Sequence, residues 1–125
     1  MAKKPRIMII DGNTELSEEL KAVLEAGGKK VNVFTDGEDA VDNVEKIKPD
    51  IIFIDVKWGR GNSFFTVLRL RDLAHTKNTP IITMSRHYTN ESIEKFMSVI
   101  GINGHISKPF RPEHVEKLID DTVSK

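Results

Sequence analysis

The sequence contains no cysteine, and its 125 residues carry no net charge, because 19 lysines and arginines balance 19 aspartates and glutamates. Without cysteine the chain forms neither a disulfide nor a zinc–thiolate site, which suits a reducing compartment. A balanced charge creates no field that would draw the protein to nucleic acid or to a membrane surface. These absences exclude a disulfide-stapled scaffold and argue against binding by bulk charge.

Long apolar runs are also missing. No stretch approaches the length of about 20 apolar residues that a transmembrane helix needs. The basic amino end, MAKKPR, leads directly into a short strand-like segment and lacks the small-residue cleavage site of a signal peptide. We therefore expect a soluble cytoplasmic protein with no membrane contact, in which residues 1–125 form a single domain around one core.

The sequence does contain a regular alternation of short apolar runs and amphipathic stretches of helical period. The run IIFID at 51–55 has four apolar residues without polar alternation, which is typical of a strand covered on both faces. Further strands are expected at 7–10, 31–35, 80–84 and 105–107. The helices carry residues at helical spacing whose apolar members are expected to face the core: Leu16, Leu20, Val23 and Leu24; Ala40, Val41, Val44 and Ile47; Phe64, Val67, Leu68 and Arg71; Ile93, Phe96, Met97 and Ile100; and, after the last strand, Val115, Leu118 and Ile119.

Strict alternation of five strands and five helices predicts a parallel sheet with right-handed crossovers. The expected fold class is therefore α/β: a doubly wound, five-stranded parallel sheet of order 2-1-3-4-5 between helical layers. This is the flavodoxin-like three-layer sandwich, in which ligands bind at the carboxyl ends of the strands.

Polar residues follow four of the predicted strands: Asp11, Asp55, Ser85 and Lys108. Because the strands are parallel, the four residues share one edge of the sheet, and the strand order places Asp11 opposite Asp55 at the switch point. A crevice that holds two carboxylates, a hydroxyl and an ammonium is a candidate site.

These four positions, together with Lys-Pro-Phe at 108–110 and GINGH before it, resemble the receiver domain of two-component response regulators, the CheY-like type, over essentially the whole chain. The resemblance implies that Asp55 accepts a phosphoryl group from a histidine kinase or a phosphotransfer protein. It also implies that Asp11 and Asp55 hold Mg²⁺, that Ser85 and Lys108 bind the phosphoryl oxygens, and that the Lys108–Pro109 bond is cis.

The resemblance further implies a signalling switch rather than an enzyme. In that family, the surface formed by the helix near 90–100, the strand at 105–107 and the last helix meets a downstream protein. Here this surface would carry Lys95, His105 and Glu113.

The chemistry explains why such a set of groups is needed. A carboxylate that attacks phosphorus brings negative charge toward negative charge, so that a metal and an ammonium must neutralise the oxygens in the transition state. Mg²⁺ prefers six oxygens and is normally held by one or two carboxylates, with waters and phosphate.

The sequence departs from the family pattern at four positions. Gly12 follows Asp11 where a second acid is usual, and Lys57 occupies a position whose backbone carbonyl normally contributes to the metal site. Arg86 stands where a small residue is preferred, and His105 where the family has a tyrosine or phenylalanine switch. We expect Mg²⁺ to bind weakly or not at all, with the ammonium of Lys57 as a partial substitute for the metal.

Two alternatives remain at this stage. A pseudo-receiver would keep the fold and the protein contacts but lose phosphorylation or carry it out without metal. A small enzyme or cofactor protein is disfavoured, because an FMN binder needs a phosphate loop where this chain has DGNTE, and a haloacid-dehalogenase-type phosphatase needs an aspartate where it has Lys57.

Overall fold

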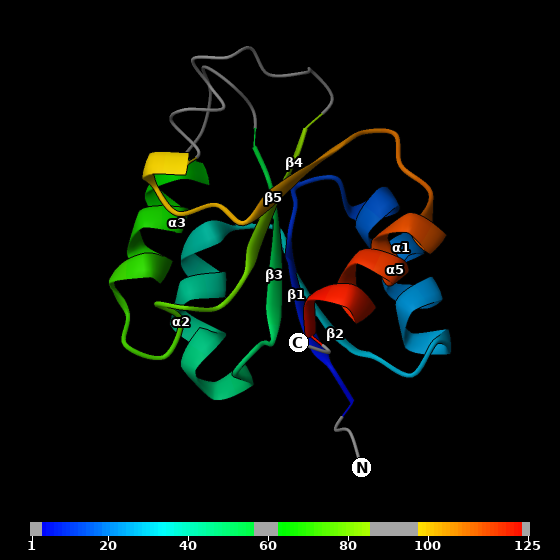
Figure 1. The fold of residues 1–125 in the computed structure, drawn as a ribbon, viewed down its shortest axis with the longest axis horizontal. Helices are drawn as coiled ribbons and strands as arrows, with labels where there is room; N and C mark the ends of the chain where they lie inside the picture. The colour runs from blue at the N-terminus through cyan, green and yellow to red at the C-terminus, as the bar shows by residue number, and fades with distance from the viewer. Residues whose placement is uncertain (1–3, 57–62, 86–97, 124–125) are drawn as a thin grey trace.

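The structure, a computed structural model, describes residues 4–56, 63–85 and 98–123. Its elements, in chain order, are β1 (Arg6–Ile10), α1 (Thr14–Ala26), β2 (Lys30–Phe34), α2 (Gly37–Ile47), β3 (Ile51–Asp55), α3 (Ser63–Asp72), β4 (Ile81–Ser85), β5 (Gly104–Ser107) and α5 (Pro112–Val123). All five strands are parallel, in the order β2-β1-β3-β4-β5 (Figure 1). The predicted strand order is therefore confirmed.

Five helices were expected, and the described part of the chain contains four. The remaining helix was placed near 90–100, and residues 86–97 lie outside the described residues. Ser98 and Val99 are helical, Ile100 is buried, and Gly101 follows with a φ of 83°. A left-handed glycine of this kind is typical of a helix end.

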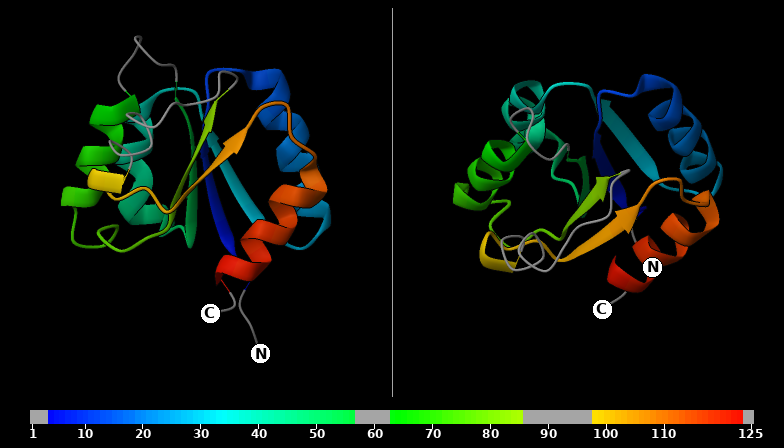
Figure 2. Two further views of the ribbon diagram at one scale, coloured as in Figure 1. Left: turned by 45° about the horizontal axis from the view of Figure 1, so that its top comes forward. Right: turned by 90° about the horizontal axis from the view of Figure 1, so that it is seen from above.

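The helices form two layers, one on each face of the sheet (Figures 1 and 2). Ile7 and Ile9 of β1 pack in the cluster under α1 and α5, whereas Met8 and Ile10 pack in the cluster under α2 and α3. Because successive strand residues point to opposite faces, a strand buried on both sides needs apolar residues at every position. This double burial explains the unbroken apolar runs and confirms the three-layer arrangement.

The inner face of α3 differs from the expected one. Leu68 was expected to be buried but is 47% exposed, while Thr66, Val67 and Leu70 face the core. Phe64, Val67 and Leu68 have helical spacing. Thr66, Val67 and Leu70 have it as well, and these three pack on the sheet. The prediction for Leu68 was wrong because periodicity alone does not select between two overlapping stripes.

Arg71, near the end of α3, ties the α3–β4 turn to the segment before β5. Its guanidinium donates to the carbonyl oxygens of Thr79 at 2.7 Å and Gly101 at 2.6 Å, and to Asn103 Oδ1 at 2.7 Å. Asn103 Oδ1 also accepts the N–H of Ile81 at 2.9 Å. Burial lowers the pKa of Arg71 from its ordinary value, although an arginine stays charged in proteins. These bonds fix where β4 and β5 begin.

The helices of the described residues are too short or too polar to cross a bilayer.

Candidate functional site

The adjacent strands β1 and β3 bring the two predicted acids together. Ile10 lies beside Ile54 in the sheet, so that Asp11 and Asp55 follow side by side at the carboxyl edge. The backbone N–H of Asp11 donates to the carbonyl oxygen of Phe34 at 2.9 Å, which continues the strand pairing by one residue. The Asp11 side chain is 3% exposed and that of Asp55 10% exposed, so little water screens their charges.

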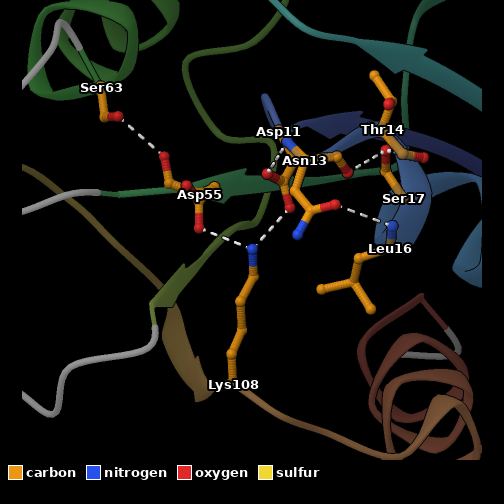
Figure 3. Close-up of polar contacts among 8 residues, drawn as sticks. All are labelled: Asp11, Asn13, Thr14, Leu16, Ser17, Asp55, Ser63 and Lys108. Carbon is orange, nitrogen blue, oxygen red and sulfur yellow. Dashed lines mark hydrogen bonds and ion pairs between the residues drawn. The ribbon is translucent and has the colours of Figure 1, made fainter.

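Lys108 enters the same site from the loop after β5. Its ammonium donates to Asp11 Oδ2 at 2.8 Å and lies 2.9 Å from Asp55 Oδ1 (Figure 3). The Lys108–Pro109 bond is cis, as the resemblance implied, and the N–H of Lys108 donates to the carbonyl oxygen of Ser85 at 2.7 Å. One buried ammonium thus shields two carboxylates from each other, and the three groups together carry a charge of −1.

The loop after Asp11 is held by a chain of local hydrogen bonds. Asp11 Oδ1 accepts the N–H of Asn13 at 2.9 Å, and Asn13 Oδ1 in turn accepts the N–H of Leu16 at 3.1 Å, which caps α1. The hydroxyl of Ser17 donates to the carbonyl oxygen of Asn13 at 2.9 Å (Figure 3). Asp11 is therefore fixed by both of its oxygens.

Asp55 is anchored through its backbone by a residue that the sequence analysis missed. Ser63, the first residue of α3, donates its hydroxyl to the Asp55 carbonyl oxygen at 2.8 Å (Figure 3). A serine at the start of a helix is a recognisable capping signal. The sequence gives no sign, however, that its partner lies at the end of the preceding strand.

Ser85 and His105 meet on the neighbouring strands β4 and β5. His105 Nε2 lies 3.2 Å from Ser85 Oγ, and its Nδ1 lies 2.7 Å from Thr83 Oγ1. The register explains both contacts, because Thr83 pairs directly with His105 and Ser85 lies two residues further on the same face of β4. Thr83 was not predicted as a site residue, because a threonine inside an apolar strand is also an ordinary β-former.

The atypical positions are only partly described. Gly12 is exposed, and a Cβ added there would meet no atom within 4 Å. Lys57 and Arg86 lie outside the described residues, as does Trp58.

Two carboxylates, those of Asp11 and Asp55, are available to bind a divalent cation at this site. In the described part of the chain no group of three or more histidines, cysteines, aspartates or glutamates is placed to hold a metal. Two carboxylates satisfy the minimum that Mg²⁺ needs when water and phosphate supply the remaining oxygens. The residues therefore fit Mg²⁺, although Lys108 competes for both carboxylates.

The fold and the site together define a class, the phosphorelay receivers of two-component signalling. A sequence model of the response regulator receiver domain matches residues 7–120, and the chain belongs to this family. Such domains are signalling modules rather than enzymes, and they interact with histidine kinases and other proteins.

Curated relatives agree with this assignment. The hybrid signal transduction histidine kinase C of Dictyostelium discoideum is 30% identical over 95% of this chain and 10% of its own length. The response regulator protein GraR of Staphylococcus saprophyticus is 28% identical over 83% of this chain and 45% of its own. Protein PilG of Pseudomonas aeruginosa is 25% identical over 88% of this chain and 81% of its own. The chain thus spans less than half the length of the first two relatives.

Solved structures share the fold. The chemotaxis protein CheY4 of Vibrio cholerae has a TM-score of 0.88 at 23% identity, covering 96% of this chain and 99% of its own. The receiver domain of the sensor histidine kinase PA1611 of Pseudomonas aeruginosa, described with a magnesium ion coordinated in its active site cleft, has a TM-score of 0.84 at 20% identity. This likeness covers 98% of this chain and 100% of that domain.

Proposed function

We propose that this chain accepts a phosphoryl group on Asp55 from a histidine kinase or a phosphotransfer protein and thereby switches a protein-binding surface. The observation that supports this most directly is the ammonium of Lys108, which lies between Asp11 and Asp55 at the carboxyl edge of the sheet. The proposed role is that of a cytoplasmic signalling domain and not of an enzyme.

In the proposed reaction an oxygen of the Asp55 carboxylate attacks the phosphorus of a phosphohistidine. A new P–O bond forms as the P–N bond breaks, the electron pair leaves with the imidazole nitrogen, and the product is an acyl phosphate. Negative charge grows on the phosphoryl oxygens, and the Lys108 ammonium already lies where it can neutralise part of it.

We expect Mg²⁺ to be held by Asp11 and Asp55, where it would supply further positive charge for the phosphoryl oxygens. Because Gly12 offers no carboxylate, this binding should be weaker than in receivers with two adjacent acids, or absent. That the Lys57 ammonium replaces part of the missing charge remains a proposal.

Ser85 is the proposed hydroxyl donor to a phosphoryl oxygen. To make that bond, its hydroxyl would turn from His105 toward Asp55, and the His105 ring would lose one of its contacts with β4. His105 would thus report the state of the site to β5 and to the proposed partner surface, of which β5 and α5 lie in the described part of the chain.

This partner surface can be mapped. In a complex with a cognate partner, we expect slower amide hydrogen exchange in β5 and α5, around His105 and Glu113, than in the free protein. Slower exchange confined to α1 or α2 would contradict the proposed surface.

The proposed phosphorylation is tested by treatment with acetyl phosphate or phosphoramidate, with and without Mg²⁺, followed by intact mass spectrometry. We expect the mass of one phosphoryl group to be added, faster with Mg²⁺ than without. If no mass is added under either condition, the proposed phosphorylation is contradicted and the pseudo-receiver alternative is favoured.

A further inference from the structure

A second polar site lies at the opposite end of the sheet from Asp55. It is a pocket of about 440 Å³ between the edge strand β2, the first residue of β1 and the last turn of α2. Four of its six lining residues are cations, and the lining consists of Arg6, Lys30, Asn32, Lys46, Ile47 and Lys48.

The sheet register explains why these side chains converge. Arg6 pairs with Lys30 and Met8 with Asn32, and register partners in adjacent parallel strands point to the same face. Met8 is buried in the cluster under α2 and α3, so Arg6, Lys30 and Asn32 also lie on the α2 side. Lys46 in the last turn of α2 and Lys48, which ends the helix, also line the pocket.

The positive charge of this pocket is not neutralised by nearby acids. None of its four cations forms an ion pair with a carboxylate among the described residues, where the ion pairs involve Lys29, Lys108 and Lys117. The carboxylate of Asp50 accepts the backbone N–H of Arg6 at 2.8 Å and does not line the pocket. Like charges directly opposite each other across two strands, as at Arg6 and Lys30, destabilise a sheet.

The backbone of Lys48, which ends α2 with its N–H donating to the carbonyl oxygen of Val44, is unusual for a lysine. Lys48 has a φ of 54°, the one positive φ of a non-glycine residue in the described part of the chain, and it precedes Pro49. A left-handed lysine is strained, and glycine or asparagine would be favoured there. Unfavourable backbone conformations are found most often at functional sites.

We propose that this pocket binds a small polyphosphate anion, either the phosphate chain of a nucleotide or an inorganic polyphosphate. Several cations around one pocket match the several charges of such a chain, and lysine and arginine are the usual phosphate ligands. The Asn32 amide can donate a further hydrogen bond, and Ile47 provides an apolar wall. The pocket would couple the receiver to an anion independently of phosphorylation at Asp55.

The test is isothermal titration calorimetry of the full chain with tripolyphosphate and with ATP, without Mg²⁺ so that the metal does not occupy the phosphates. Two double variants are compared: Lys30→Gln with Lys48→Gln, and Lys77→Gln with Lys117→Gln, whose lysines are exposed outside the pocket. Both variants lose two positive charges, in the pocket or outside it, and the control also breaks the exposed ion pair of Lys117 with Asp121.

We expect one molecule of tripolyphosphate or ATP to bind per wild-type chain. The affinity should be at least about tenfold weaker in the pocket variant and within about twofold of wild type in the control. Amide NMR shifts on titration should centre on 30–32 and 46–48. If ATP binds more tightly than tripolyphosphate, the ligand of the pocket is a nucleotide. If the two affinities are equal, the pocket recognises the phosphate chain alone. Equal loss in both double variants, or no binding at millimolar ligand, would overturn the proposal.

Discussion

At the scale of single residues, Lys108 shields two carboxylates from each other in a site with little water. The Asp11 side chain is 3% exposed and that of Lys108 4%, so removal of the ammonium leaves buried negative charge without a counterion. The same ammonium contacts both of the carboxylates that would hold Mg²⁺.

Replacement Lys108→Ala should therefore lower the free energy of unfolding by about 3–5 kcal/mol at neutral pH. Mg²⁺ should restore part of this loss, because a cation that binds only the folded state stabilises it. Urea unfolding with and without Mg²⁺ measures both effects. The matched control is Lys117→Ala, which breaks an exposed ion pair with Asp121 and should cost less than about 1 kcal/mol. An unfolding energy for Lys108→Ala that equals that of the control would contradict the electrostatic account of the site.

Gly12 provides a second test at this scale. A Cβ added at Gly12 meets no atom within 4 Å, so the backbone there accepts a side chain and Gly12→Asp can supply the second acid. A third carboxylate is expected to strengthen Mg²⁺ binding by about 5- to 150-fold, the equivalent of about 1–3 kcal/mol. Titration calorimetry gives the affinity, and the fluorescence of Trp58, the single tryptophan, gives an independent readout.

The matched control is Gly12→Asn, which adds the same shape without the charge and should bind Mg²⁺ as wild type does. Combination of Gly12→Asp with Lys57→Asn should bind most tightly if the Lys57 ammonium repels the metal. Micromolar Mg²⁺ affinity in the wild type would show that Asp11 and Asp55 suffice, and that the proposal of a weakened site is wrong.

The positions of Asp11, Asp55 and Lys108 could be predicted because each follows an apolar strand, and a parallel sheet brings such positions to one edge. Ser63 and Thr83 could not be predicted as contacts of the site, because a single hydroxyl residue has no periodic signal and its partner depends on tertiary structure. The roles of all these residues in phosphorylation remain predictions.

At the scale of elements, the strands were easier to predict than the helix faces. A strand buried on both sides has an unbroken apolar run, whereas α3 presents two overlapping stripes of helical spacing, and only the packing of Val67 and Leu70 on the sheet selects one. For this reason the strands and their parallel direction followed from the alternation, whereas the strand order rested on the flavodoxin-like winding and the shared polar edge. Leu68 was assigned to the wrong side.

Two phenylalanines, one in the core and one on the surface, allow the stabilising effect of core packing to be measured against that of an exposed apolar side chain. Phe53 of β3 is fully buried, whereas Phe65 of α3 is 68% exposed. Replacement Phe53→Ala should lower the free energy of unfolding by about 3–5 kcal/mol, because it leaves a cavity between the sheet, α1 and α5. Phe65→Ala should change it by less than about 0.5 kcal/mol. Urea unfolding compares the two, and similar losses would mean that the described packing of α3 or β3 is wrong.

At the scale of the whole molecule, zero net charge hides an uneven distribution. The carboxyl edge of the sheet holds a buried acidic site around Asp55. The opposite end holds the pocket that four cations line, among them Arg6. At the edge of the sheet opposite β2, His105 of β5 contacts Ser85 of β4. This arrangement fits a domain that converts an event at one edge into a change on its surface.

The central claim is that Asp55 is the phosphoacceptor, and its position is tested by intact mass spectrometry of Asp55→Asn after treatment with a small phosphodonor and Mg²⁺. The control, Asp72→Asn, removes an exposed carboxylate of α3. We predict that one phosphoryl group is added to the wild type and to the control, and none to Asp55→Asn. An undiminished label on Asp55→Asn, or an acid-stable label on a serine, would contradict the claim.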